Sequence, residues 1–362
     1  DEEHLLTRFI QEWQSKSFDV VTGWNIEMFD IPYIHNRIKN VISKQEANKL
    51  SPWNIVDDRE IRMTGGMTYV AKVIAGVSVL DYLQMYKKFS YTPQESYRLD
   101  HIANYELGEK KLDYSEYDSL LDLYKNDYQK FIEYNIKDCE LVEKLEEKLK
   151  FIEQVFTLAY DGRVNYIDTF TTVRMWDIII HNYLLGQGIV VPQTKVPDED
   201  EPIVGAYVKD PQVGMHKWVV SFDLNSLYPH LIMQYNISPE TFIERLDDMS
   251  IDSILGGAYN KPEIREVLEQ ENATIAATGC IFRKDKQGFL PQLMELVYED
   301  RTKYKKLMIE AKKEYQANPS YEVEKKIAKY NNLQMAKKIQ LNSCYGALGN
   351  RFFRWFDPKY AE

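Results

Sequence analysis

The chain has 362 residues, 44% apolar and 28% charged, which describes a folded protein too long for one small core. A formal net charge of −11 excludes a uniformly basic nucleic-acid-binding coat, although not a local basic patch. The three cysteines lie far apart without metal-ligand spacing, which excludes a disulfide framework and a structural zinc site. Neither a signal peptide nor an apolar run of the ~20 residues that span a bilayer is found, so we expect a soluble protein with no membrane partner.

Hydrophobic periodicity and turn residues predict elements along the whole chain. The N-terminal half is predicted to hold a helix at 3–13, a short buried strand at 18–21, a hairpin of strands 61–63 and 68–73, and long helices between 120 and 158. An acidic, proline-bounded run at 196–202 is the best candidate for a linker. Beyond it we predict a strand at 217–222 and two helices, at 292–316 and 321–345.

Positive charge is concentrated in those last two helices. Residues 301–340 contain 11 Lys and Arg against 4 Asp and Glu, a local charge of +7, so the remainder carries −18. A basic segment on an acidic body suggests one face that binds a polyanion. A solvated pair of lysine-rich helices explains the same charge, and charge alone does not separate the two.

Three carboxylates occupy positions that call for an explanation. Asp138 interrupts an apolar helical stripe, so it should be protonated, bound to a metal, or paired with a basic residue elsewhere. Asp30 precedes Ile31-Pro32 and a helical run, which also suits a helix N-cap. Asp223 closes the predicted strand 217–222 and could hold Mg²⁺ beside a triphosphate, or simply open an Asx-turn.

The two basic helices supply cations at helical spacing. Arg301 and Lys305 lie four residues apart on the first, while Lys338, Asn342 and Tyr345 share one face of the second. Such faces can clamp phosphates while the ring stacks near a base or sugar. Gly346 and Gly349 allow a nucleotide to approach the backbone closely, and a helix C-cap is the alternative explanation for them.

Several of these residues fall in motifs that resemble those of the family B DNA polymerases. SFDLNSLYP at 221–229 is similar to motif A of that family, and KKIQLNSCYGALG at 337–349 to motif B. TGWNIEMFDIPY at 22–33 and YNIKD at 134–138 resemble its second and third exonuclease motifs. VGAY at 204–207 and NISPET at 236–241 are also similar to family segments. The closest likeness is to replicative polymerases of large tailed bacteriophages.

The resemblance implies a role for each matching residue. In the proofreading site, Asp30 and Asp138 bind metal and Tyr134 orients the attacking water. In the polymerase site, Asp223 and the Leu224 carbonyl bind the catalytic metals. The implied nucleotide-binding residues are Ser226 and Leu227 through backbone N–H groups, Tyr228 under the sugar where it excludes a 2′-hydroxyl, Arg301, Lys305 and Lys338 on the β- and γ-phosphates, and Asn342, Tyr345 and Gly346 around the new base pair.

The implied fold is α/β: an RNase H-like 3′–5′ exonuclease domain followed by an α+β polymerase palm with inserted helical fingers. The corresponding boundaries are 1–150 for the exonuclease domain, 151–195 for a helical connection, 196–287 for the first part of the palm, 288–350 for the fingers and 351–362 for the return to the palm. The resemblance further implies two Mg²⁺ ions per site, with Mn²⁺ as a substitute, and primer-template DNA, dNTPs, a sliding clamp and replisome proteins as partners. The expected location is the cytoplasm of an infected host cell.

Two expected motifs are not found in the sequence: the Asp-x-Glu of the first exonuclease motif and the Tyr-Gly-Asp-Thr-Asp pattern of the second palm carboxylates. We therefore hypothesise that the chain is a polymerase fragment with little or no activity alone. One alternative is a subunit of a split polymerase that acts only with its complement. Another is a nuclease only, against which motif B argues because a nuclease needs no triphosphate clamp.

Overall fold

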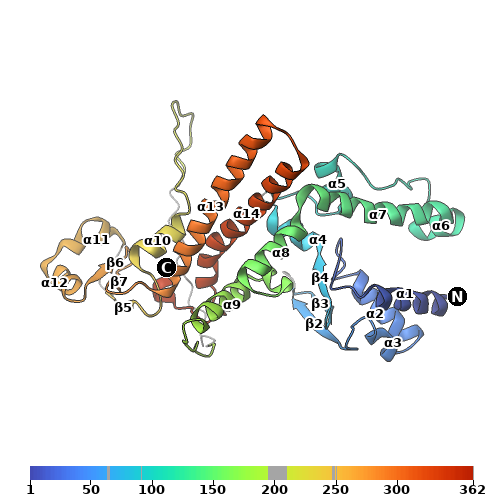
Figure 1. The fold of residues 1–362 in the computed structure, drawn as a ribbon, viewed down its shortest axis with the longest axis horizontal. Coiled ribbons are helices and arrows are strands. Elements are labelled where there is room, and N and C mark those ends of the chain that lie inside the picture. Colours follow the sequence, from blue (N-terminus) through green and yellow to red (C-terminus); the bar gives the residue numbers. More distant parts are fainter. Residues whose placement is uncertain (63–65, 91, 195–209, 247–248, 250, 362) are drawn as a thin grey trace. The chain divides into compact units, whose positions relative to one another are not determined.

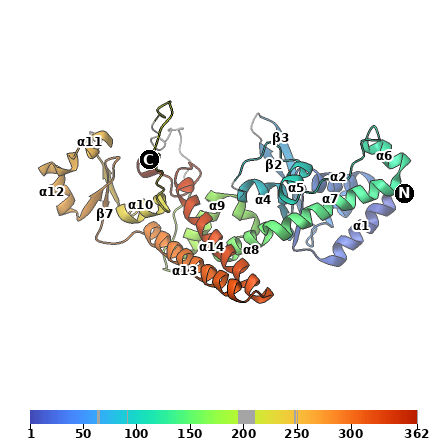
Figure 2. The same ribbon diagram turned by 90° about the horizontal axis from the view of Figure 1, so that it is seen from above.

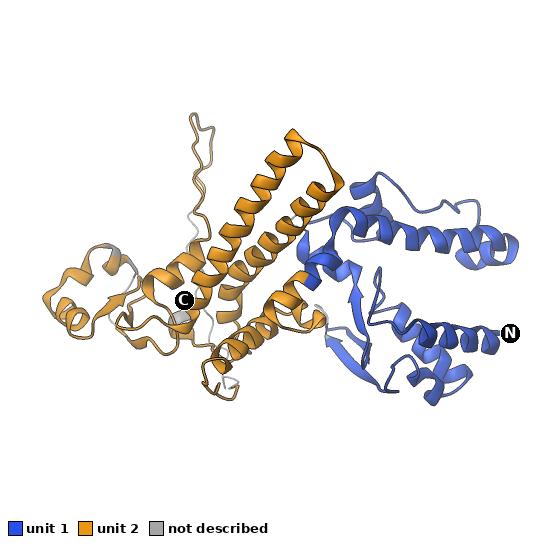
Figure 3. Cartoon of the chain, viewed as in Figure 1, with its two compact units in different colours: residues 1–156 blue, residues 157–362 orange. Residues whose placement is uncertain are grey.

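The computed structural model describes residues 1–62, 66–90, 92–194, 210–246, 249 and 251–361. The chain forms two compact units, Asp1–Phe156 and Thr157–Glu362 (Figure 3). The predicted linker at 196–202 lies outside the described residues.

Unit 1 combines short strands with helices (Figure 1). Its elements are α1 (Glu2–Lys16), β1 (Val20–Gly23), α2 (Asp30–Val41), α3 (Lys44–Asn48), β2 (Val56–Arg62), β3 (Thr68–Ile74), β4 (Ser78–Asp81), α4 (Tyr82–Phe89), α5 (Leu99–Leu107), α6 (Leu120–Asn126), α7 (Tyr128–Leu149) and the first half of α8 (Phe151–Gly162). β1 pairs in parallel with β4, and β2 pairs with β3 in the antiparallel direction. The predicted N-terminal helix and hairpin are therefore confirmed, and the predicted strand at 18–21 is found at 20–23, half-buried rather than fully buried.

The core of unit 1 lies where α1 and α2 pack on the strands. α1 contributes Ile10, and α2 contributes Ile31 and Ile38, which lie two turns apart; all three are 5% exposed or less. This spacing is the amphipathic pattern that the sequence shows. A second cluster joins α4 to α8, where the ring of Phe151 contacts those of Tyr82, Tyr86 and Phe89.

Unit 2 is mainly helical, with one small sheet. Its elements are the end of α8, η1 (Tyr166–Phe170), α9 (Thr172–Leu185), α10 (Leu227–Tyr235), β5 (Phe242–Arg245), α11 (Ile251–Leu255), η2 (Ala258–Asn260), α12 (Pro262–Gln270), β6 (Ala273–Ile275), β7 (Cys280–Arg283), α13 (Phe289–Ala317), α14 (Tyr321–Leu348) and α15 (Pro358–Ala361). The three strands form an antiparallel sheet in the order β5-β7-β6.

Two long helices, α13 and α14, form a helical hairpin that confirms the predicted pair at 292–316 and 321–345 (Figures 1 and 2). The turn between them ends at Ser320, whose hydroxyl accepts a hydrogen bond from Val323 N at 3.3 Å and so caps α14. Leu341 and Cys344 of α14 are fully buried, and Trp176 of α9 donates a hydrogen bond to Ser343 Oγ at 3.1 Å. α9, α13 and α14 thus share one core.

The segment 236–241 fixes the start of α13. Asn236 Oδ1 accepts from Gly288 N at 2.9 Å, and Glu240 Oε1 accepts from Phe289 N at 2.6 Å. Asn236 Nδ2 also donates to the carbonyls of Arg283 and Lys286, at 2.6 and 2.9 Å. A Cβ at Gly288 would lie 2.4 Å from Ser238 Cβ, so this close approach requires glycine. The NISPET segment therefore satisfies the first amide groups of a 29-residue helix.

The predicted strand at 217–222 is wrong: these residues have no regular secondary structure. A strand needs a partner for its backbone groups, and no described strand pairs with this segment. Its apolar side chains are correspondingly exposed, with Trp218 at 97% and Phe222 at 91%. The short apolar run that suggested a strand is present in the sequence, but the described structure gives it no partner strand.

Two further observations concern the described part of the chain. None of its helices combines the length and the apolar character needed to cross a bilayer. None of the three cysteines, all of which are described, forms a disulfide; Cys139 is exposed, and Cys280 and Cys344 are buried.

Candidate functional site

A large groove in unit 1 brings together three of the predicted site residues. It has a volume of about 1740 Å³, and Asp30, Tyr134 and Asp138 all line it. Asp30 comes from the start of α2, and the other two lie one helical turn apart on α7. Residues more than a hundred positions apart in the sequence therefore face one space, as the motif assignment requires.

Asp30 is not the N-cap residue that its sequence context also suggested. α2 begins at Asp30 itself, and the N-cap position belongs to Phe29. Burial raises the pKa of Asp30 above its ordinary value, against a smaller opposing effect of a backbone hydrogen bond. A cation bound near such a half-buried carboxyl would stabilise its charged form.

Asp138 is found in one of the states expected for it, paired with a basic residue, and one of its oxygens has no partner among the described residues. Its Oδ2 accepts a hydrogen bond from Lys111 Nζ at 2.6 Å, so the predicted ion pair with a basic residue exists. Its Oδ1 is buried and has no hydrogen-bond partner in the described structure. Lys111 also contacts the Tyr134 hydroxyl at 3.3 Å and lies 5.2 Å from the centre of that ring. One lysine therefore holds both α7 residues of the site.

The negative charges of Asp30 and Asp138 both affect the pKa of a third residue that lines the groove, Cys139. Burial raises the pKa of the Cys139 thiol, and the negative charges of Asp138 and Asp30 raise it further. Burial lowers the pKa of Lys111, but its hydrogen bonds to Asp138 and Tyr134 outweigh this effect and the pKa is raised overall. Lys111 therefore stays protonated at neutral pH.

These residues fit a divalent cation in part. The unpartnered Oδ1 of Asp138 and the half-buried carboxyl of Asp30 are hard oxygen donors of the kind that Mg²⁺ and Mn²⁺ prefer. Within the described ranges, however, no three His, Cys, Asp or Glu side chains gather into a metal-binding set. The groove thus supplies some of the ligands that such an ion needs.

A second group of predicted residues meets in unit 2, where α10 packs against α13. Arg301 of α13 donates from Nη1 to Ser226 Oγ at 2.8 Å, and Ser226 is the N-cap residue of α10. The Arg301 Nε is buried with no hydrogen-bond partner in the described structure. Leu227 is the first residue of α10, so its N–H is among those that the helix leaves unsatisfied. A guanidinium beside free helix amides is well suited to an anion.

The rings of Tyr228 on α10 and Tyr345 on α14 are stacked, 4.5 Å apart and 7° from parallel. Asn342 is exposed one turn before Tyr345. Gly346 lies inside α14 and is therefore not its C-cap, which is Gly349. A Cβ at Gly346 would meet no atom within 4 Å, and Gly346 lines a cavity of about 380 Å³ between α14 and the start of α9.

Four more residues were predicted for this site. Lys305 is exposed on α13 one turn after Arg301, and Lys338 is half-buried on α14. Asp223 and Leu224 lie in the exposed segment before α10, and in the described part of the chain no hydrogen bond or ion pair joins Asp223 to Arg301 or Lys305. The structure therefore joins Arg301 to Ser226 and Tyr345 to Tyr228, and the positions of Asp223 and Leu224 as metal ligands stay a prediction.

Sequence reasoning missed a buried lysine next to Lys338. Lys337 Nζ lies 2.8 Å from Asp161 Oδ1 and 2.8 Å from Asp300 Oδ2, with its side chain 9% exposed. Asp161 Oδ2 also accepts from Gln340 Nε2 at 2.7 Å. The only sequence signal was its place beside Lys338, because its partners come from 37 and 176 residues away.

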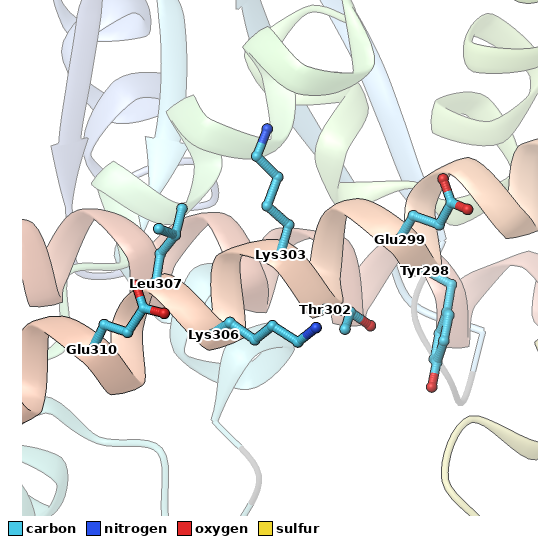
Figure 4. Close-up of a pocket in the computed structure, with 7 residues that line it drawn as sticks. All are labelled: Tyr298, Glu299, Thr302, Lys303, Lys306, Leu307 and Glu310. Atoms are coloured by element: carbon cyan, nitrogen blue, oxygen red, sulfur yellow. The ribbon is translucent and has the colours of Figure 1, made fainter.

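A hollow of about 480 Å³ follows one side of α13 and contains none of the predicted residues (Figure 4). Seven side chains of that single helix line it: Tyr298, Glu299, Thr302, Lys303, Lys306, Leu307 and Glu310. With walls from one helix only, it does not resemble a ligand site.

Comparison with known proteins agrees with the motifs. Residues 170–356 match the model of DNA polymerase family B, and residues 1–102 match that of the DNA polymerase family B exonuclease domain. The chain is 32% identical to the DNA-directed DNA polymerase of Escherichia phage RB69 and 30% identical to that of Enterobacteria phage T4. Both alignments cover all of this chain, and they cover 43% of the RB69 protein and 44% of the T4 protein. It is 27% identical to the DNA polymerase delta catalytic subunit of Caenorhabditis elegans, over 96% of this chain and 31% of that protein. The chain thus spans less than half the length of these relatives.

Proposed function

Because this chain belongs to DNA polymerase family B, we propose that the protein of which it forms part is a DNA-directed DNA polymerase with a 3′–5′ proofreading exonuclease. In this proposal unit 1 carries an RNase H-like exonuclease domain. Unit 2 carries part of the palm, together with fingers formed by α13 and α14. The observation that carries the proposal is that motif A residues of α10 contact Arg301 of α13 and the motif B residue Tyr345 of α14.

The polymerase site is proposed to bind the incoming dNTP through the residues that surround the start of α10. Arg301 and the N–H groups of Ser226 and Leu227 hold the phosphates, and Lys305 and Lys338 add positive charge. These cations favour the polyphosphate leaving group, because they stabilise the charge that develops on it.

The ring of Tyr228 is proposed to pack beneath the sugar, where a 2′-hydroxyl would collide with it. Its stacking on Tyr345 keeps the ring in place. Asn342, Tyr345 and Gly346 then face the new base pair, and the absence of a Cβ at Gly346 leaves room for a base or sugar.

The exonuclease site is proposed to occupy the groove of unit 1. Tyr134 orients the attacking water, and Lys111 keeps Tyr134 and Asp138 in place while offering positive charge to the scissile phosphate.

Asp30 and Asp138 would hold divalent ions in the groove, and Asp223 with the Leu224 carbonyl would hold them in the polymerase site. Bound Mg²⁺ or Mn²⁺ supplies a charge that stabilises the attacking and leaving oxygens of an in-line displacement. The proposed partners are primer-template DNA, dNTPs, a sliding clamp and replisome proteins, and the proposed location is the host cytoplasm.

Substitution in the intact polymerase tests the two-site assignment. Asp223→Ala should reduce primer extension at least about 10³-fold while single-stranded DNA is still degraded, because extension loses a metal ligand and degradation does not. Asp30→Ala and Asp138→Ala should have the opposite effect. Asp252→Ala, an exposed change on α11, is the control and should alter neither rate. Loss of both activities in any one folded variant would show that the assignment is wrong.

A further inference from the structure

A buried carboxylate outside the groove of unit 1 holds the backbone of the loop that leads to Asp30. Asp81 is 2% exposed, ends β4 and does not line the groove. Its Oδ1 accepts hydrogen bonds from Asn25 N at 3.0 Å and Leu83 N at 2.9 Å, and its Oδ2 accepts from Glu27 N at 3.1 Å. One side chain therefore satisfies amides from two segments more than fifty residues apart.

The loop between β1 and α2 needs such support, because its backbone is unusual. Asn25 has a φ of 63°, in the left-handed region, and a Cβ at Gly23 would lie 2.4 Å from Ile26 Cγ2. Parallel pairing places Gly23 directly beside Asp81. A tight turn with a left-handed residue persists only where its surroundings hold it.

Backbone hydrogen bonds carry the position of this loop to Asp30. Phe29 N donates to the Asn25 carbonyl at 3.1 Å, and Ile31 N donates to the Ile26 carbonyl at 3.0 Å. Phe29, which precedes Asp30, is thus bonded to Asn25, whose amide Asp81 holds. Ile31, which follows Asp30, is bonded to Ile26, which lies between Asn25 and Glu27. The path from Asp81 to Asp30 contains two hydrogen bonds in series.

We propose that Asp81 is a positioning residue of the exonuclease site, which fixes the loop 23–29 so that the Asp30 carboxylate faces Asp138 across the groove. This inference rests on the proposed function of that groove. Asp81 touches neither the DNA nor the metal ions in this proposal, and it acts only through the loop. Groups that orient metal-binding carboxylates change activity by about 10–100-fold when they are removed.

A purely structural role predicts a different result, because Asp81 is also the N-cap residue of α4. Asp81→Ser separates the two roles. Serine still caps the helix through Leu83 N, but its single short hydroxyl cannot also reach Asn25 N and Glu27 N. Asp81→Asn keeps the shape of the side chain but replaces one acceptor oxygen with an NH₂ group, which cannot accept a hydrogen bond from a backbone N–H. Asp127→Asn is the control, since Asp127 caps α7 through Lys130 N and touches no residue of the loop.

The experiment uses the intact polymerase and measures four quantities for each variant: exonuclease kcat and KM on a single-stranded oligonucleotide, primer extension, melting temperature, and amide hydrogen exchange over residues 22–31. We expect Asp81→Ser and Asp81→Asn to lower exonuclease kcat about 10–100-fold. KM should change less than about threefold, extension should stay unchanged, and exchange within the loop should accelerate. Asp127→Asn, whose side chain can still cap α7, should leave kcat within about twofold of wild type.

Three results would overturn the inference. The first is an exonuclease kcat within twofold of wild type in either Asp81 variant that folds. The second is a loss of kcat in Asp127→Asn equal to that in the Asp81 variants. The third is fast hydrogen exchange of the Asn25 and Glu27 amides in the wild-type protein. A wild-type polymerase that degrades no DNA would instead refute the proposed function, and the exchange data would then decide alone whether Asp81 holds the loop.

Discussion

At the scale of single residues, the stacked pair of Tyr228 and Tyr345 gives a direct prediction about sugar selection. In the intact polymerase, Tyr228→Ala should raise the ratio of kcat/KM for rNTPs to that for dNTPs at least about tenfold, because the ring that would collide with a 2′-hydroxyl is gone. Tyr228→Phe keeps the ring and is the matched control. Single-nucleotide insertion kinetics measure both ratios. An alanine variant that discriminates as well as wild type would exclude Tyr228 from this role.

Individual residues also show what a sequence can and cannot reveal. Asp138 was recognisable because it is an anion in an apolar helical stripe, and its helix is present as predicted. Lys111 and Asp81 gave no such signal. Their importance depends on partners 27 and 56 residues away, at Asp138 and Asn25, and a contact of that range is created by the fold. A lysine or aspartate in a loop or at a strand end is otherwise unremarkable.

At the scale of elements, the pairing of Lys337 with Asp161 and Asp300 sets the register of α14 against α13 and the end of α8. Lys337→Met should lower the free energy of unfolding by about 2 kcal/mol, since it leaves two carboxylates without their cation. The loss should stay below the ~3–5 kcal/mol of a fully enclosed pair, because the Asp300 side chain is 44% exposed.

Denaturant unfolding of the chain measures the effect of Lys337→Met, and Lys329→Met, an exposed change on α14, is the control. If the two substitutions cost the same, the buried ion pairs do not fix the register of the helix.

A second element-scale prediction concerns the segment after α5, which brings Lys111 to α7. Hydrogen bonds from Lys137 and Lys144 of α7 lower the pKa of Glu109 from its ordinary value of 4.5 to about 2. A carboxyl whose pKa is lower in the folded state stabilises the fold above pH 4.5, and this contribution is lost as the pH falls towards 2. Glu109→Gln should therefore lower the melting temperature slightly at pH 7, and the difference from wild type should shrink below pH 4.5. A difference independent of pH between 7 and 3 would contradict this origin.

The elements themselves were predictable where their pattern is local. Helices α1, α13 and α14 follow from apolar residues at helical spacing, and hairpin β2–β3 follows from two short apolar runs around a glycine turn. The strand predicted at 217–222 is absent, because strand formation depends on a partner strand, and a local sequence pattern carries no information about that partner. The N-cap prediction for Asp30 failed by one residue, since the helix begins at Asp30.

At the scale of the whole molecule, each compact unit contains one of the two residue groups. Asp30, Tyr134 and Asp138 belong to unit 1, while Ser226, Tyr228, Arg301 and Tyr345 belong to unit 2. The sequence predicted this division from the order of the motifs. The domain boundaries at 150, 195, 287 and 350 and the catalytic roles of the residues stay predictions, because spacing along a chain does not determine which atoms meet a substrate.

The central claim, that nucleotide addition and removal use separate sites, is tested most directly by the release of labelled dNMP from a labelled dNTP on primer-template DNA. Release requires that a nucleotide is first added and then removed. Asp223→Ala alone should release none, because it adds nothing, and Asp30→Ala alone should extend the primer without release. An equimolar mixture of the two variants should restore release, because one protein adds the nucleotide that the other removes. A mixture that releases no more than the sum of the two variants alone would contradict the claim.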